Sequence, residues 1–121
     1  MHKMTKYTSI PPVVKRAVFL RDNGCCVLCG SPYGEPAAHV VRRSQGGLGT
    51  ERNVVTLCRG CHRAYDEGAN LSRYGAGTTQ ESLYCYLVAY LKGFYPDWNR
   101  ADMIYKKGMD NGQAVDDTRG S

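Results

Sequence analysis

Four cysteines stand in two C-x-x-C pairs, and their type and spacing suit the binding of one zinc ion. The pairs are Cys26/Cys29 and Cys58/Cys61. Cysteines at this spacing on a tight turn direct both sulfurs at one Zn²⁺, and two such turns complete a tetrahedral S₄ site. The sequence therefore predicts a structural zinc ion held by all four thiolates.

Two more cysteines lie outside this pattern. Cys25 adjoins the first pair and is a competing ligand, although its spacing to Cys29 is less usual. Cys85 lies in a segment of helical periodicity, which predicts a small core residue. Six cysteines in a short chain also suit a disulfide framework. The absence of an apolar secretory signal in the first residues favours zinc. A redox C-x-x-C protein is a third interpretation, but it needs a thioredoxin-like βαβ pattern that the sequence lacks.

The spacer between the two pairs is longer than zinc binding alone requires. It runs over 28 residues, 30–57, against the roughly 15–20 of zinc-ribbon spacing. It contains His39 and Asn53, and His62 follows the last cysteine directly. The surrounding segments read AHVVRRSQGG (38–47) and NVVTLCRGCH (53–62). The extra length therefore indicates a second function built on the same residues.

These motifs together resemble the HNH endonuclease family, most closely small HNH proteins of bacteriophages and prophages. The resemblance covers roughly residues 20–67. It implies a ββα-metal fold, in which a β-hairpin followed by a helix holds one divalent metal. It also implies that His39 is the general base, that Asn53 fixes the hairpin loop and steers the base, and that His62 binds the catalytic metal.

An imidazole suits the role of general base, because its ordinary pKa near ~6.5 leaves it mostly neutral at neutral pH. The ring of His39 must also be held in one tautomer. We therefore expect a carbonyl or amide group to bond its second nitrogen.

One position departs from the family pattern. Ala38 stands where many family members have a metal-binding His or Asp. Asp66 lies four residues after His62, so a helix would place both on one face; an exposed helix carboxylate is the alternative. One histidine and one carboxylate would leave several waters on the cation. Oxygen ligands suit Mg²⁺ or Mn²⁺, and the nitrogen ligand favours Mn²⁺ or Ni²⁺.

The net charge of +5 is unevenly distributed. Residues 1–73 carry 11 Lys/Arg against 5 Asp/Glu, whereas residues 74–121 carry 5 against 6. A basic front indicates a polyanionic partner, here DNA, although a soluble basic surface is the alternative. No segment resembles a base-reading helix, which predicts low intrinsic sequence specificity. Arginine grips phosphate bidentately, and the candidates are Arg43 first, then Arg42, Arg59, Arg63 and Arg52.

Together with these patterns, the resemblance implies an α+β fold class: a ββα-metal module with zinc knuckles, flanked by N-terminal and C-terminal helices. We expect a basic flexible arm over 1–11, the zinc-stapled nuclease module over 12–70, a helical extension packed on it over 71–108, and a disordered tail over 109–121. No apolar run approaches the ~20 residues of a membrane span.

Within the module, Pro11-Pro12 open a helix that Asp22 ends, with Lys15, Arg16 and Arg21 on its solvent side. Short strands are expected over 37–41 and 53–57, and a helix over 59–67 that Gly68 stops.

In the C-terminal extension, Thr78-x-x-Glu81 predicts the capping box of a helix that ends before Pro96. Its apolar residues recur at helical spacing, which predicts a face buried in the core. Asn99 caps an expected last helix that reaches Lys107.

The sequence thus predicts a metal-dependent DNA endonuclease or nickase with a structural zinc ion. The alternative is a non-catalytic zinc-binding module that binds DNA and derives from such a nuclease, and Ala38 favours it. The resemblance to phage proteins implies a phage- or prophage-encoded protein in the cytoplasm of a bacterial host. It also associates the chain with phage packaging proteins as partners.

Overall fold

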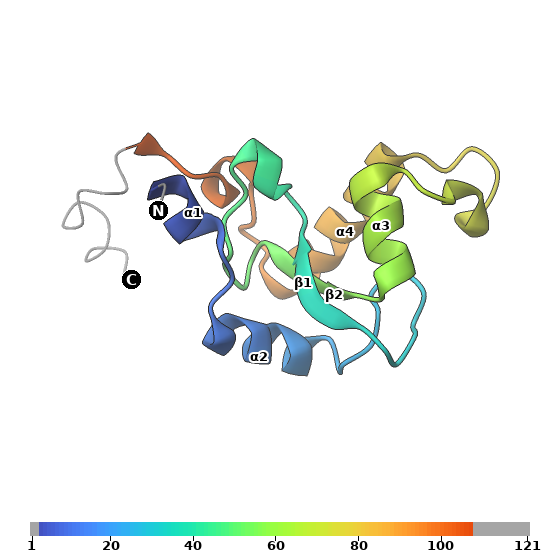
Figure 1. Cartoon of the computed structure of the whole chain (residues 1–121), viewed down its shortest axis with the longest axis horizontal. Coiled ribbons are helices and arrows are strands. Elements are labelled where there is room, and N and C mark those ends of the chain that lie inside the picture. The colour runs from blue at the N-terminus through green and yellow to red at the C-terminus, as the bar shows by residue number, and fades with distance from the viewer. Residues whose placement is uncertain (1–2, 108–121) are drawn as a thin grey trace.

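The computed structural model describes residues 3–107; the predicted disordered tail, 109–121, lies outside them. In chain order, the main elements are α1 (Lys3–Thr8), α2 (Pro12–Arg21), β1 (Glu35–His39), β2 (Val54–Leu57), α3 (Arg59–Glu67) and α4 (Gln80–Phe94) (Figure 1). Short 3₁₀ turns, η1 (Arg43–Gln45), η2 (Leu71–Tyr74) and η3 (Arg100–Met103), join them. Within the described residues, no helix combines the length and apolar character needed to cross a bilayer.

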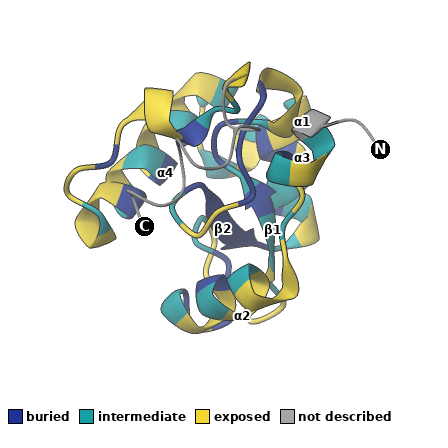
Figure 2. Cartoon of the chain, turned by 90° about the vertical axis from the view of Figure 1, so that its left-hand side faces the viewer, coloured by how far each residue is buried: buried dark blue, intermediate teal, exposed yellow. Residues whose placement is uncertain are grey.

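The two strands form an antiparallel hairpin at the centre of the fold. His39 pairs with Val54 and Ala38 with Val55, and the register is irregular between Glu35 and Ala38. Helix α2 contacts both strands, α3 contacts β2, and α4 packs on α3. The strands therefore lie between α2 on one side and α3 with α4 on the other (Figures 1 and 2). This is the β-β-α order expected from the sequence, and the α+β class is confirmed.

The core gathers around β2 and one face of α4. All four residues of β2 are buried, and Leu83, Leu87 and Leu91 meet Tyr65 of α3 in one cluster. Residues four apart share a helix face, so the predicted apolar stripe of α4 is confirmed at these three positions. Cys85 is exposed. The prediction of a core cysteine was wrong, because two residues beyond Leu83 the helix has turned away from the core.

Helix α2 begins at Pro12 and ends at Arg21, as predicted. The expectation that Arg21 faces solvent was wrong, since its side chain is only 6% exposed. It forms a 2.8 Å ion pair with Asp22 and donates to the carbonyls of Glu51 and Val54, each at 2.8 Å. The hairpin covers the end of the helix at this point, which the helical periodicity of α2 alone does not reveal.

Residues Lys3–Thr8 form α1, where the sequence predicts a flexible arm. Thr8 is buried, and the amide of Gly49 donates to the carbonyl of Tyr7 at 3.0 Å. A Cβ atom at Gly49 would lie 2.0 Å from the carbonyl oxygen of Ser9, so only glycine permits this approach. Packing between distant segments orders the N-terminal residues, which explains why local composition does not show it.

The C-terminal region differs from the prediction in two details. The capping box of α4 uses Thr79 and Ser82 rather than Thr78 and Glu81. Asn99 does cap a helical turn, but that turn is the short η3. The chain after η3 pairs with the loop beyond β1, because Ile104 forms a β-bridge with Gly47 and Tyr105 donates to the carbonyl of Gly46 at 2.8 Å. This pairing replaces the longer helix expected up to Lys107.

Candidate active site and zinc cluster

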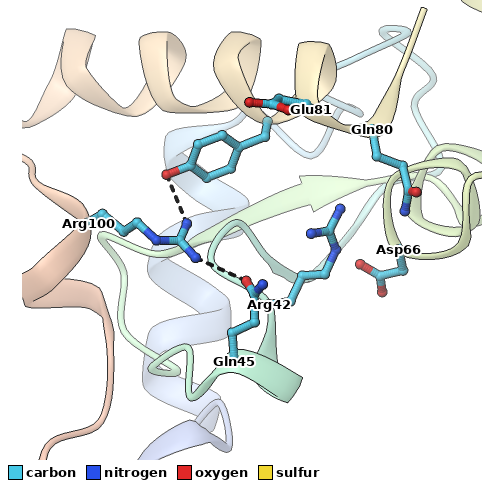
Figure 3. Close-up of a pocket in the computed structure, with 7 residues that line it drawn as sticks. Arg42, Gln45, Asp66, Gln80, Glu81 and Arg100 are labelled. Atoms are coloured by element: carbon cyan, nitrogen blue, oxygen red, sulfur yellow. Dashed lines mark hydrogen bonds between the residues drawn. The ribbon is translucent and has the colours of Figure 1, made fainter.

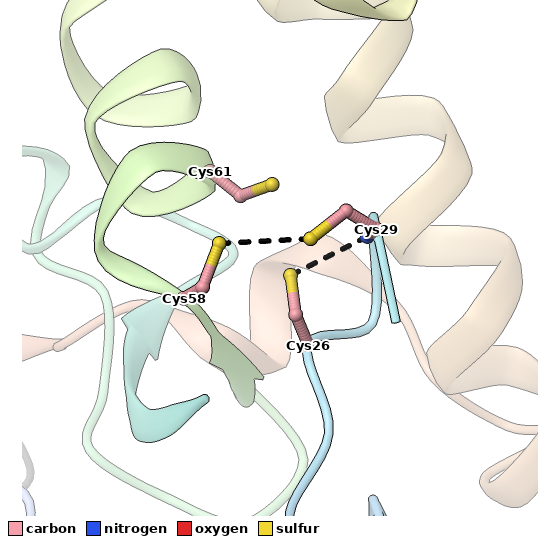
Figure 4. Close-up of side chains that lie close together, drawn as sticks. All are labelled: Cys26, Cys29, Cys58 and Cys61. Atoms are coloured by element: carbon pink, nitrogen blue, oxygen red, sulfur yellow. Dashed lines mark hydrogen bonds between the residues drawn. The ribbon is translucent and has the colours of Figure 1, made fainter. Parts of the chain in front are cut away.

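The four cysteines of the C-x-x-C pairs come together at one end of the hairpin (Figure 4). Their sulfur atoms all lie within 4.8 Å of one another, and those of Cys29 and Cys58 are 3.6 Å apart. Tetrahedral zinc with Zn–S bonds near ~2.3 Å places its sulfurs about 3.8 Å apart. The donor set therefore fits a structural zinc ion as predicted, and Cys25 does not belong to it.

Local structure explains how the sulfurs converge. Cys58 is the N-cap of α3 and Cys61 lies in its first turn, while Gly30 closes the other knuckle with a φ of 81°. Burial, followed by the neighbouring thiols, raises the pKa of the Cys61 thiol. A bound cation reverses this effect, since zinc deprotonates its thiol ligands. With four protein ligands the site is closed, which is typical of structural rather than catalytic zinc.

His39 lies at the end of β1, with one ring nitrogen already engaged. Its Nε2 lies 2.7 Å from the backbone carbonyl oxygen of Thr8. A carbonyl only accepts, so Nε2 carries the proton and the neutral ring keeps its lone pair on Nδ1. Burial, aided by the positive charge of Arg43, lowers the pKa of His39, although the bond to Thr8 opposes this. The carbonyl partner expected from the sequence is therefore present, and the lowered pKa of His39 favours the neutral ring.

Asn53 is fully buried and braces the loop that follows His39. Its Oδ1 accepts from the amide of Val41 at 2.8 Å. Its Nδ2 donates to the carbonyls of Val41 at 3.1 Å and Leu48 at 2.9 Å. All three bonds go to backbone groups, so Asn53 fixes the path of the loop and presents no polar atom to solvent.

His62 and Asp66 face each other across one turn of α3. The Nε2 of His62 and the Oδ2 of Asp66 are 3.0 Å apart, and the two side chains are 31% and 40% exposed. The hydrogen bond with Asp66 raises the pKa of His62, with burial opposing it. The pair predicted from the i,i+4 spacing is therefore formed, and solvent reaches both side chains.

Asp66 joins two adjoining hollows of about 230 Å³ each. The first hollow is also lined by His39, Arg42 and Arg43. The second is lined by His62, Arg59 and Arg63. The base candidate, the metal-ligand candidates and four of the five predicted arginines thus share one continuous surface centred on Asp66.

Ala38 adds nothing to this surface. Its side chain is fully buried and belongs to the hydrophobic core, so it points away from solvent. Glu35, three residues earlier, lines the hollow of His62. Sequence reasoning missed Glu35 because no motif marks it. Thr8 was missed too, since a backbone carbonyl leaves no trace in residue type.

The arginines differ in how they are held. Arg43 donates to the hydroxyls of Thr8 at 3.1 Å and Ser9 at 2.9 Å. Arg42 donates to the carbonyl of Tyr65 at 3.0 Å and lies over its ring.

Arg63 is exposed and lies 3.4 Å from Glu67, and Arg59 is also exposed. Arg52 stands apart from the other arginines. It pairs with Asp97 at 2.9 Å and lies over the ring of Tyr95. The structure therefore does not bring Arg52 to the candidate site.

Comparison with known proteins agrees with this geometry. Residues 26–68 match the family model described as HNH endonuclease. No curated protein matches the chain. The matched segment runs from the first zinc cysteine through the hairpin and α3, and it includes His39, Asn53 and His62. The resemblance expected from the sequence is therefore confirmed over residues 26–68, which are similar to HNH endonucleases.

Proposed function

We propose that this protein is a metal-dependent endonuclease that hydrolyses phosphodiester bonds in DNA. The observation that carries the proposal is the placement of His39. Its Nε2 is bonded to the Thr8 carbonyl, and the ring borders a hollow that it shares with Asp66 and two arginines. A neutral base beside a carboxylate and positive charge suits attack by water on a phosphodiester.

In the proposed reaction, the Nδ1 of His39 accepts a proton from a water molecule in this hollow. The water oxygen then attacks the phosphorus atom, and the bond from phosphorus to the leaving oxygen breaks. The Thr8 carbonyl stabilises the imidazolium that results, because it continues to accept from Nε2. The leaving oxygen takes its proton from solvent, and the imidazolium returns its own proton to solvent.

The residues beside His39 suit a divalent ion of the kind that the family implies. The Nε2 of His62 and the Oδ2 of Asp66, which are 3.0 Å apart, would hold such an ion with one nitrogen and one oxygen ligand. When bound, Mg²⁺, Mn²⁺ or Ni²⁺ would neutralise charge that develops on the phosphate. Ala38 supplies no ligand, so waters or substrate oxygens would complete the coordination.

DNA binding in this proposal relies on arginines around Asp66, with Arg43 as the main phosphate contact and Arg42, Arg59 and Arg63 beside it. Contacts to phosphate carry little sequence information, so intrinsic specificity is low. Nicking of one strand suits a single module with one such surface. As the resemblance implies, we also propose that the protein is encoded by a phage or prophage, acts in the cytoplasm of a bacterial host and has phage packaging proteins as partners.

A second candidate function is a DNA-binding zinc module without catalysis, which the buried Ala38 favours. Plasmid nicking separates the two. Zinc-loaded protein is incubated with supercoiled plasmid and no added ion, or with Mg²⁺, Mn²⁺ or Ni²⁺, and its zinc content is measured afterwards. The nuclease proposal expects nicking only with an added ion. Binding of the plasmid without nicking under every condition would favour the non-catalytic module.

A further inference from the structure

A hollow of about 580 Å³ adjoins the candidate active site on the side of α4. It shares Asp66 with both smaller hollows and Arg42 with the hollow of His39. Gln80, Tyr84 and Arg100 also line it, with Gln80 beside Asp66 and Arg100 on the other side (Figure 3); these three residues lie outside the segment that matches the HNH family. The region after the family segment therefore builds a recess beside the proposed point of cleavage.

One wall of this recess is held by Arg100. Its guanidinium donates to the Tyr84 hydroxyl and to the Oε1 of Gln45, each at 3.1 Å. The guanidinium carbon lies 5.4 Å from the centre of the Tyr84 ring. These contacts join η3, α4 and η1 and fix two planar groups side by side. The amide nitrogen of Gln45 remains for another partner, because Arg100 engages only its oxygen.

The opposite wall is built on Tyr65. Arg42 and Gln80 both donate to the Tyr65 carbonyl, at 3.0 and 2.8 Å, and the Arg42 guanidinium lies 4.5 Å from the centre of the Tyr65 ring. The Nε of Arg42 is buried and has no hydrogen-bond partner in the described residues. The Oε1 of Gln80 accepts no hydrogen bond from them either. This wall thus offers a second planar group and unused polar atoms.

The balance of charge indicates which part of a nucleotide suits the recess. The recess is lined by two positive side chains, Arg42 and Arg100, and two negative ones, Asp66 and Glu81. A phosphate bound there would be repelled by the two carboxylates. A nucleobase is neutral, has hydrogen-bonding edges that amides can match, and stacks on aromatic and guanidinium planes. The volume also lies within the range of about 300–1,000 Å³ that is typical of small-ligand sites.

We propose that this recess binds one unpaired nucleobase of the DNA strand, next to the phosphate on which His39 acts. A paired base is excluded, because its hydrogen-bonding edge and both faces are already occupied in the duplex. The substrate class is therefore DNA with a single-stranded or flipped nucleotide beside the cut. Gln45 and Gln80 lie where they contact the edge of the base. This inference rests on the proposed function, whose phosphate-binding surface it extends.

The test measures binding without cleavage. Zinc-loaded protein without added divalent ion is titrated against three labelled DNAs by fluorescence anisotropy. The first is a duplex with one unpaired nucleotide, the second carries an abasic nucleotide at that position, and the third is fully paired. We expect the unpaired base to strengthen binding about 5- to 150-fold over the abasic DNA, which is the range for stacking one base.

Two variants on different elements assign that preference to the recess. Arg100→Gln and Gln45→Ala should each reduce it severalfold, while Arg16→Gln, an exposed arginine of α2, controls for the loss of one charge. Zinc content and thermal unfolding verify that each variant folds. If Arg100→Gln does not fold, the result for Gln45→Ala alone tests the inference. Equal affinity of the wild type for all three DNAs would overturn the inference. So would variants that weaken binding to all three DNAs equally.

The outcome is separable from that of the nuclease proposal. If the protein prefers the unpaired base but never nicks DNA, base binding by the recess is supported and the catalytic role of His39 is contradicted. If the protein nicks DNA without that preference, the nuclease proposal is supported and base binding by the recess is contradicted.

Discussion

Helix α3 carries two sets of candidate metal ligands of opposite design, a cysteine cluster and the pair His62 and Asp66. The cysteine cluster at its start offers four sulfur atoms from two knuckles, which closes a tetrahedral site. One turn along, His62 and Asp66 offer one nitrogen and one oxygen on a surface open to solvent. Soft, closed sites suit permanent zinc, whereas sparse nitrogen and oxygen donors suit an exchangeable ion that keeps its waters. The same short helix thus supplies ligands for a stabilising zinc site and, in the proposed function, for the catalytic ion.

The cysteine cluster and the candidate active site also differ in what positions them. The cluster depends on residues 26–61, which carry all of its ligands. His39 depends on the Thr8 carbonyl from α1, and its loop depends on the side chain of Asn53. Damage to the cluster should therefore unfold the module. Damage to the candidate active site should leave a folded protein with altered chemistry.

The largest effect is expected from loss of a zinc ligand. Cys58→Ser should release zinc and unfold the module, because structural zinc contributes about 10–16 kcal/mol, more than the stability of a small domain. Cys25→Ser is the matched control, since Cys25 adjoins the cluster but lies outside it. Metal analysis and circular dichroism measure both. A folded, zinc-free Cys58→Ser protein would contradict the structural role of zinc.

The buried ion pair behind the hairpin is expected to rank second. Asp22 accepts from Arg21 and from the Tyr90 hydroxyl, and it binds the amide of Thr56 at 2.9 Å. Asp22→Asn should cost about 3–5 kcal/mol, the range for breaking a buried pair. Asp97→Asn removes the exposed pair with Arg52 and should cost at most about 1 kcal/mol. Urea unfolding compares the two variants.

The same pair predicts a dependence of stability on pH. Burial alone raises the pKa of Asp22, but the bonds from Arg21 and Tyr90 outweigh it and lower the pKa below its ordinary value. The stabilisation is therefore complete above the unfolded-state pKa near ~3.9 and is lost as pH falls through the folded-state value. The cost of Asp22→Asn should shrink in acid; a cost independent of pH would contradict the assignment.

Asp66 tests the solvent-exposed pair of candidate ligands on α3. If its carboxylate binds the catalytic ion, Asp66→Ala should raise the Mn²⁺ concentration needed for half-maximal nicking by at least about 10- to 100-fold, because that is the effect of losing a group that only supports a metal ligand. Glu67→Ala, one residue along on the same helix, is the control for loss of an acidic group. An unchanged Mn²⁺ requirement would make Asp66 a surface carboxylate that only pairs with His62.

The smallest effect concerns DNA affinity. Arg43→Ala should weaken binding to every sequence alike, by roughly fivefold, and reduce the salt slope by about 1. Arg52→Ala removes the same charge from a position away from the site and should change affinity less. Titrations at several salt concentrations measure both. If Arg43→Ala instead changes which sequence is preferred, Arg43 reads bases and is not a phosphate contact.

Local signals predicted the two short strands, α3 and the cysteine cluster, and the resemblance implied that the strands form a hairpin. Gly68 stops α3 with a φ of 75°, and the C-x-x-C pairs fix their own turns. They did not predict α1, the burial of Arg21 or the contact of Thr8 with His39. Each of these depends on contacts between residues far apart in the chain, and a backbone carbonyl carries no signature in residue type.

The most direct test of the account compares His39→Ala with the wild type under conditions where both bind zinc and DNA. With Mn²⁺ and a supercoiled plasmid, the rate of nicking should fall by about 10²- to 10⁴-fold, the contribution of a general base. Zinc content and DNA affinity should stay unchanged, and more Mn²⁺ should not restore the rate. A His39→Ala protein that nicks as fast as the wild type would contradict the central claim that His39 is the base.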